Sequence, residues 1–104
     1  MELTLTFRHV PRSGALEAHA RELGSRLERV FERIARCHIS LEGSSGTGNS
    51  GPYVVKIELT IPGAQIHADS LRADEVDRRD VYLAMREAYD DAKRQLQHLQ
   101  HGRH

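Results

Sequence analysis

Residues 53–69 read YVVKIELTIPGAQIHAD, and this stretch decides the fold. Apolar and polar side chains alternate from Val55 to Ile61, which is the two-residue period of a strand with one buried face. Pro62 and Gly63 then predict a turn, after which residues 64–69 form a second, shorter strand. The stretch therefore predicts two consecutive strands of one sheet.

The same alternation occurs twice upstream, at residues 37–42 and at residues 2–8. The segment at 37–42 leads into a glycine- and serine-rich stretch, residues 43–52, for which we predict an irregular loop because ordering it costs much conformational entropy. Three successive strands joined by a loop and a turn favour an antiparallel meander, which the first strand is expected to join.

Two segments have the three-four spacing of amphipathic helices. The first runs from Ala15 to about Ala35 after Ser13 as N-cap, and the second from about Val81 to Gln100 after Asp80 as cap. The expected apolar stripes are Leu16, Ala20, Leu23, Leu27, Val30 and Ile34 in the first helix, and Tyr82, Met85, Tyr89, Ala92, Leu96 and Leu99 in the second. Favourable i, i+4 ion pairs are expected at Glu17–Arg21, Glu22–Arg26 and Glu32–Arg36.

This order, β-α-β-β-β-α, predicts one α+β domain over residues 1–104. We expect a four-stranded sheet with both helices packed on one face and a wet, polar opposite face. A second loop is expected at residues 70–79. Close packing is expected at Gly24, where glycine weakens the helix by roughly 1 kcal/mol relative to alanine.

Composition limits the function classes. Fifteen basic and fifteen acidic side chains give a formal net charge of zero, which argues against a strongly basic RNA-binding protein but leaves open a local basic surface. No apolar run approaches the ~20 residues of a membrane span, and residues 1–10 lack a secretory signal pattern. With Cys37 as the only cysteine, expected as a buried thiol, we predict a cytoplasmic protein.

Catalytic patterns are absent from the sequence. The glycines of 43–52 lack the lysine and following helix of a P-loop, and no nucleophile–base arrangement stands out. His98, His101 and His104 have i, i+3, i+6 spacing, but a solvated tail explains them better than a metal site. We therefore predict no enzymatic activity, no cofactor, no metal and no small-molecule substrate.

Several short motifs occur in a fixed order along the chain. They are RHV at 8–10, AL at 15–16, LERVFERI at 27–34, PG at 62–63, IHA at 66–68, DVYLAM at 80–85 and RQL at 94–96. With these motifs the chain resembles the ribosome hibernation-promoting factors, the family that includes protein Y and the proteins once called sigma-54 modulation proteins. The resemblance covers nearly the whole chain.

The resemblance implies a β-α-β-β-β-α fold similar to a double-stranded-RNA-binding domain. It also implies binding to the small ribosomal subunit near the decoding site, where the family blocks messenger and transfer RNA and silences idle ribosomes. We expect a short, monomeric form without a C-terminal domain. The sequence departs from the family at Glu17, Leu23 and Asp91, where basic or other polar residues are usual, and its two loops are longer.

Ten residues are candidates for contacts with RNA. Arginines at three-four-three spacing are expected on one side of the first helix, a basic stripe on the second, and a pair at the end of the first strand. These residues are Arg26, Arg29, Arg33 and Arg36; Arg79, Arg86, Lys93 and Arg94; and Arg8 and His9. For the first helix, spacing alone favours a solvated face neutralised by nearby glutamates, and the family resemblance reverses that preference. The stripe on the second helix and His9 fit a solvated face and a turn role equally well, and Tyr82 and Tyr89 are expected in the core and not as stacking platforms.

These observations leave two hypotheses for the function. The leading hypothesis is a hibernation factor that binds ribosomal RNA. The alternative is a protein-interaction module of the same fold that has lost RNA binding. A contiguous basic strip across both helices would favour the first, and evenly mixed charge the second.

Overall fold

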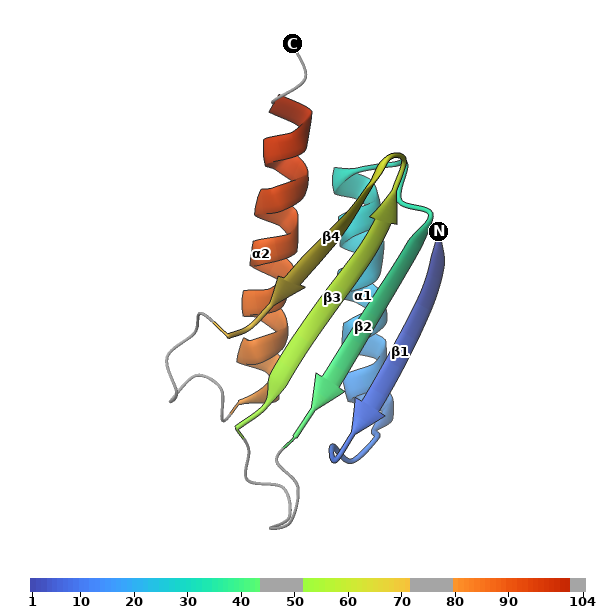
Figure 1. The fold of residues 1–104 in the computed structure, drawn as a ribbon. Coiled ribbons are helices and arrows are strands. Elements are labelled where there is room, and N and C mark those ends of the chain that lie inside the picture. The colour runs from blue at the N-terminus through green and yellow to red at the C-terminus, as the bar shows by residue number, and fades with distance from the viewer. Residues whose placement is uncertain (44–51, 72–79, 102–104) are drawn as a thin grey trace.

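The computed structural model describes residues 1–43, 52–71 and 80–101 of the chain, and these residues form the predicted α+β domain (Figure 1). The elements are β1 Glu2–Arg8, α1 Gly14–Val30, β2 Arg36–Glu42, β3 Val54–Ile61, β4 Ala64–Asp69 and α2 Val81–His101. The order β-α-β-β-β-α is confirmed. The predictions of irregular loops at 43–52 and 70–79 fall mostly on residues 44–51 and 72–79, which lie outside the described part.

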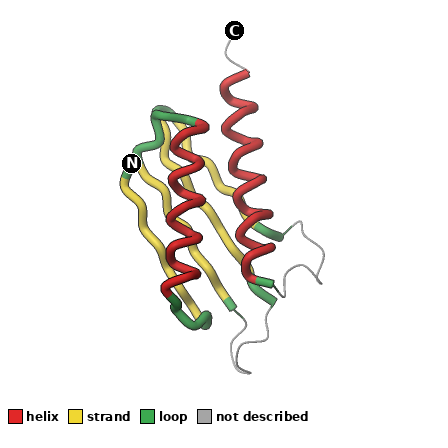
Figure 2. Tube along the Cα trace, turned by 180° about the vertical axis from the view of Figure 1, so that it is seen from behind, coloured by secondary structure: helices red, strands yellow, loops and turns green. Residues whose placement is uncertain are grey.

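The four strands form one mixed sheet in the order β1-β2-β3-β4. Strands β2, β3 and β4 make the expected antiparallel meander, whereas β1 lies parallel to β2, with Glu2 opposite Arg36. A parallel neighbour requires a crossover, and α1 provides it. Both helices cover the same face of the sheet and run in the same direction, from the β1–α1 turn toward the β3–β4 turn (Figures 1 and 2).

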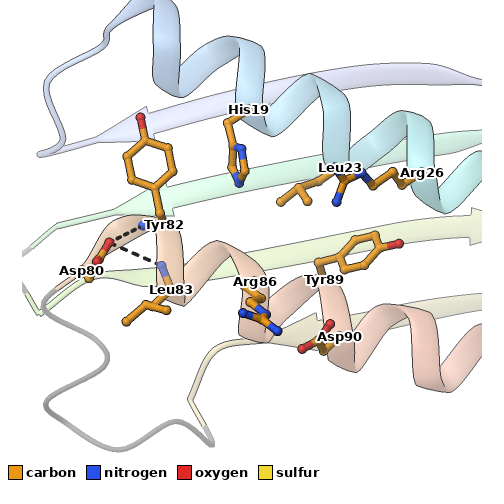
Figure 3. Close-up of a pocket in the computed structure, with 9 residues that line it drawn as sticks. All are labelled: His19, Leu23, Arg26, Asp80, Tyr82, Leu83, Arg86, Tyr89 and Asp90. Atoms are coloured by element: carbon orange, nitrogen blue, oxygen red, sulfur yellow. Dashed lines mark hydrogen bonds between the residues drawn. The ribbon is translucent and has the colours of Figure 1, made fainter.

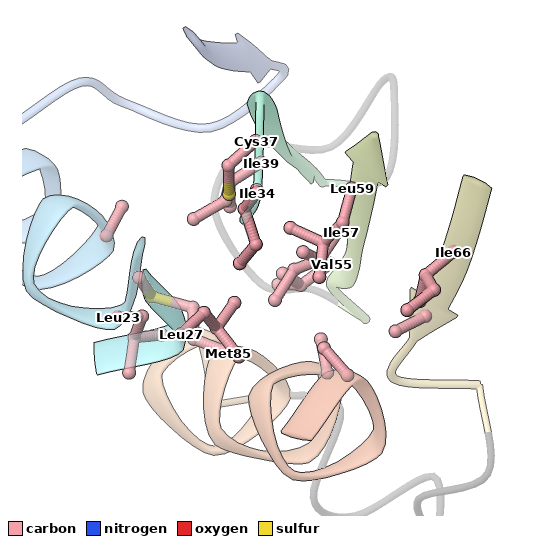
Figure 4. Close-up of a cluster of buried hydrophobic side chains, with 14 of the residues drawn as sticks. Leu23, Leu27, Ile34, Cys37, Ile39, Val55, Ile57, Leu59, Ile66 and Met85 are labelled. Carbon is pink, nitrogen blue, oxygen red and sulfur yellow. The ribbon is translucent and has the colours of Figure 1, made fainter. Parts of the chain in front are cut away.

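The core lies between the sheet and the two helices (Figure 4). Fully buried side chains come from the middle strands, including Ile39, Ile57 and Leu59, and meet Leu27 of α1 and Met85 of α2. Edge strand β1 is only partly buried. Burial of this kind contributes about 25 cal/mol per Å² of apolar surface, so this single layer of side chains is the main source of stability.

Helix α1 begins as expected but ends early. The Oγ of Ser13 accepts a hydrogen bond from the Leu16 amide at 3.1 Å, which confirms the N-cap. At the other end, Phe31 has extended backbone angles, so the helix stops at Val30 and the prediction of a helix to Ala35 is wrong. Ile34 is still buried, but from the connection to β2.

Helix length explains this error. Seventeen helical residues span about 25 Å, and the seven residues of β2 that run back along them span about 23 Å. A helix to Ala35 would have passed the start of β2, where the Ala35 amide already donates to the Thr60 carbonyl at 2.8 Å. Arg33 and Arg36 therefore lie off the helix.

The buried stripe of α2 also differs from the prediction. The buried residues are Ala84, Met85, Ala88, Ala92 and Leu96. Tyr82 and Leu99, expected in the core, are 42% and 39% exposed, and Tyr89 is half-buried. The alanines let α2 pack closely on the sheet, which turns Tyr82 to its flank. Leu99 is exposed because α2 extends beyond β4 at its C-terminal end (Figure 1).

Two glycines hold close approaches in the fold. Gly24 is buried, and a Cβ there would lie 3.1 Å from a Leu3 methyl group, which confirms the expected close packing of α1 on β1. At Gly43 a Cβ would lie 2.3 Å from the carbonyl oxygen of His9. His9 itself has φ 56°, so the turn after β1 and the end of β2 are fitted tightly together.

Candidate functional site

Five of the ten candidate cations gather along the surface between the two helices, which we call the helix seam. Arg26 and Arg29 are on α1, and Arg33 follows in the turn. Arg86 and Lys93 are on α2, seven residues apart and therefore on one flank of the helix. These five residues define the seam.

Four other candidates lie elsewhere. Arg8 and Arg36 are on strands β1 and β2, and Arg94 lies on a different flank of α2 from Arg86. His9 is exposed in the turn after β1, and its left-handed backbone fits the turn role. Arg79 lies outside the described residues.

Ion pairing separates the two sets more sharply than position does. Outside the seam, three candidate arginines have carboxylate partners: Arg94 closely with Asp91 at 2.6 Å, and Arg8 with Glu42 and Arg36 with Glu2 more loosely at 4.0 and 3.9 Å. The expected pairs Glu17–Arg21 and Glu22–Arg26 form at 3.2 Å each, whereas Glu32–Arg36 does not, because the helix has ended.

Within the seam, Arg26 is the only residue with a carboxylate partner in the described part of the chain. Among the described residues, no carboxylate lies within ion-pairing distance of Arg29, Arg33, Arg86 or Lys93. An arginine with no carboxylate partner keeps its donors free for a phosphate, which it can bind in a bidentate manner.

The seam is hollowed at both ends. One hollow, of about 520 Å³, lies between the middle of α1 and the first three turns of α2 (Figure 3). We call it the N-terminal hollow. Leu23 is buried beneath it, and its lining includes His19, Arg26, Tyr82, Arg86, Tyr89 and Asp90. Asp80 also lines it, but its Oδ1 accepts hydrogen bonds from the Tyr82 and Leu83 amides at 2.9 and 3.4 Å, which confirms it as the cap of α2.

The other, smaller hollow, of about 280 Å³, lies where α1 ends, and we call it the C-terminal hollow. Arg29 and Arg33 line it together with Glu32 and Gln100. The side-chain amide nitrogen Nε2 of Gln100 donates to the Val30 carbonyl at 2.9 Å, which satisfies one of the backbone acceptors left free at the end of α1. This contact fixes α2 against α1 beside the two arginines.

Seam charge is positive overall but not uniform. The C-terminal hollow has two arginines and one glutamate, whereas the N-terminal hollow has two arginines and two aspartates. Lys93, half-buried, lies on the flank of α2 between Arg86 and Gln100. Cations therefore lie along both helices, but carboxylates are interspersed among them and charge is balanced in the N-terminal hollow.

Sequence reasoning missed the aromatic lining of the N-terminal hollow. Tyr82 was expected in the core, but the residue is exposed and its ring meets the His19 ring edge-on, with centroids 5.1 Å apart. Figure 3 shows the rings of Tyr82 and Tyr89 extending from α2 toward α1. The run of alanines at 84, 88 and 92 was the signal that could have shown which face of α2 is buried.

The remaining chemistry of the described residues is sparse. Cys37 is buried, as expected, and desolvation raises the pKa of its thiol from 9.0 to about 12. No group of three histidine, cysteine or acidic side chains within residues 1–43, 52–71 and 80–101 could hold a metal ion. Across the same residues, no helix is long and apolar enough to cross a membrane.

The fold is an α+β domain whose two parallel helices carry several cations along the seam between them. The chain matches the family model described as sigma 54 modulation protein / S30EA ribosomal protein over residues 3–103. The chain belongs to this family of ribosome-associated proteins, which are binding factors and not enzymes. The resemblance inferred from the sequence motifs is thereby confirmed.

Solved structures share the fold. A ribosomal subunit interface protein from Coxiella burnetii superposes with a TM-score of 0.75 at 19% identity, covering 96% of this chain and 98% of that one. The N-terminal domain of protein Y from Thermus thermophilus gives a TM-score of 0.72 at 19% identity, with 95% and 99% covered. No curated protein sequence matches the chain significantly.

Proposed function

We propose that this protein binds the small ribosomal subunit through the helix seam, near the decoding site, and there blocks messenger and transfer RNA from binding. It acts in the cytoplasm and as a monomer. Family membership supports the ribosome as partner. Two structures that share the fold, a ribosomal subunit interface protein and a protein Y domain, point the same way.

The observation that carries the proposal is the division of the cations. In the described residues, Arg29, Arg33, Arg86 and Lys93 have no carboxylate partner and lie on one surface, whereas the arginines on the open face of the sheet are paired. Contacts with phosphates supply much of the affinity for RNA and position the protein on it. A rigid pair of helices holding several free cations is suited to that role.

The alternative of a protein-interaction module also has an observation in its favour. The N-terminal hollow balances Arg26 and Arg86 with Asp80 and Asp90, and mixed charge of this kind is typical of protein interfaces as well as of RNA-binding ones. The two functions differ in what competes for the surface, because only an RNA-binding factor at the decoding site is displaced by messenger and transfer RNA.

Competition on purified small subunits tests the proposal. The protein is sedimented with small subunits that are empty or already loaded with messenger RNA and initiator transfer RNA. We expect it to pellet with empty subunits and to be excluded from loaded ones. Equal binding to both would place it elsewhere on the subunit and refute the decoding-site proposal.

Charge reversal assigns the binding surface. We expect the triple variant Arg29→Glu, Arg33→Glu, Arg86→Glu to stop pelleting with empty subunits. The matched control, Arg8→Glu, Arg36→Glu, Arg94→Glu, changes net charge equally but leaves the seam intact, and we expect it to pellet. All six side chains are on the surface, so each substitution should change the free energy of unfolding by within roughly 0.5 kcal/mol, which circular dichroism and urea titration verify. Loss of binding in both variants would show that net charge, not the seam, decides.

A further inference from the structure

The N-terminal hollow has features that phosphate binding does not require. Its aromatic side chains, Tyr82, Tyr89 and His19, come from both helices, and Leu23 closes the space beneath them. Its volume of about 520 Å³ lies within the range of about 300–1,000 Å³ for sites that enclose small organic groups. A surface that only bound the phosphate backbone would need the cations and not this lining.

Tyr82 is the most informative of these residues. The residue is 42% exposed although it belongs to an amphipathic helix that buries Ala84, Met85 and Ala88 within the next two turns. The His19 and Tyr82 rings meet edge-on, with their centroids 5.1 Å apart and 71° between their planes. This contact leaves one face of the tyrosine ring uncovered. An aromatic face held in place by a second ring offers a stacking partner at low entropic cost.

The polar groups of the hollow fit a nucleotide better than a bare anion. Arg86 has no carboxylate within ion-pairing distance among the described residues, and Figure 3 shows its guanidinium and the Asp90 carboxylate extending from neighbouring turns of α2. That carboxylate repels any phosphate beside Arg86, so charge alone does not hold a ligand there. A ligand that enters must therefore add stacking and hydrogen-bond donors to its charge, and a nucleobase has both.

We propose that the N-terminal hollow receives one unstacked nucleotide of single-stranded RNA, with its base on Tyr82 beside His19 and its phosphate on Arg86. This inference rests on the proposed function and deepens it by assigning a base-binding site within the helix seam. Sequence-tolerant recognition of single strands by aromatic side chains and nearby cations is chemically general. Asp90 in the lining of the hollow would accept from an amino group of the base.

Photo-cross-linking of the wild-type protein to small subunits tests the assignment directly. Trypsin cleaves after Arg79 and Arg86, so Tyr82 is carried by the peptide of residues 80–86. We expect a cross-linked nucleotide in this peptide. Cross-links confined to other peptides would overturn the proposal, and no variant has to fold for this result.

Substitution gives the second readout. Tyr82→Leu removes the ring but keeps apolar bulk, and we expect it to weaken binding to small subunits by about 5- to 150-fold, the effect of losing one base–aromatic stack. The salt dependence should stay as in wild type, because no phosphate contact is lost. Tyr82→Phe should bind like wild type. Phe7→Leu, which removes a ring under Arg12 outside the seam, should also bind like wild type.

The outcomes separate this inference from the proposed function. If the seam charge variant loses binding while Tyr82→Leu binds like wild type, RNA binding stands and the base site is refuted. If wild type binds no small subunits, both fail. A free mononucleotide such as AMP should compete only weakly; competition as strong as that of a short single-stranded RNA would refute the RNA assignment in favour of a free nucleotide.

Discussion

The salt dependence of ribosome binding is the sharpest measure of the helix seam. Replacing Arg29, Arg33, Arg86 and Lys93 with glutamine removes four cations that have no ion-pair partner among the described residues. Each phosphate contact steepens the slope of log affinity against log salt concentration by about 0.7 on a single strand and about 0.9 on a duplex. The fourfold variant should therefore have a slope shallower by roughly 2.8 to 3.6.

This difference is large enough to measure easily. Between 50 and 200 mM salt, the wild-type protein should lose roughly a hundredfold more affinity than the variant. The assay is a fluorescence anisotropy titration of labelled protein with purified small subunits, at constant magnesium and several potassium chloride concentrations. The control replaces Arg8, Arg36 and Arg94 with glutamine; since these arginines already have carboxylate partners, its slope should match wild type. Equal slopes for wild type and the fourfold variant would refute the reasoning.

Three further predictions concern the fold. Gly43→Ala should destabilise the protein by about 1–3 kcal/mol, since its Cβ would meet the His9 carbonyl oxygen at 2.3 Å. The control is Gly14→Ala, where the added Cβ meets open space. Equal melting temperatures for the two variants would contradict the predicted clash. Ser13→Ala should cost about 1 kcal/mol in urea unfolding, because the cap of α1 is lost; an unchanged midpoint would show that the cap contributes nothing. Burial raises the pKa of the Cys37 thiol from 9.0 to about 12, so the unfolded chain loses this proton first as pH rises. The stabilisation from the neutral thiol is therefore complete below pH 9 and declines between pH 9 and about 12. Cys37→Ala should lack this decline, and parallel pH profiles of unfolding free energy for wild type and variant would refute the prediction.

The strands were predictable from sequence because their period is unambiguous. Each strand has one face in the core and one in water, so alternation fixed all four segments to within one residue of their observed bounds. Alternation along a strand does not predict which other strand pairs with it, or in which direction. The parallel pairing of β1 with β2 follows from α1 returning the chain to its starting end.

Helix ends and helix faces were less predictable, for separate reasons. The end of α1 is set by the length of β2, which the helical pattern through Ile34 does not report. In α2, the stripe through Tyr82 and Leu99 and the stripe through Ala84 and Ala88 are both compatible with the sequence. Tertiary packing chose the alanines, because small residues allow closer contact with the sheet.

The candidate site was predictable only in part, since its composition depends on partners distant in sequence. Arg36 reads like Arg33 in the sequence, yet it starts β2 beside Glu2 and is paired there. Arg94 adjoins Lys93, yet the helical turn directs it to Asp91 on another flank. The Asp91 carboxylate also accepts from the backbone amide of Asp69 at 3.4 Å, which links α2 to the end of β4.

The net charge of the chain does not report where its charges lie on the surface. A chain with fifteen cations and fifteen anions can still present a local cationic surface when its carboxylates are placed beside other arginines. In this fold the sheet's open face pairs Arg8 with Glu42 and Arg36 with Glu2. These exposed pairs contribute little stability individually; their effect is to offset the charges of Arg8 and Arg36, whereas Lys56 on the same face has no ion pair among the described residues. Under the proposed function, the chain has no net charge to attract RNA in general, so selectivity for one RNA site must come from the shape of the seam and from the groups that line its hollows.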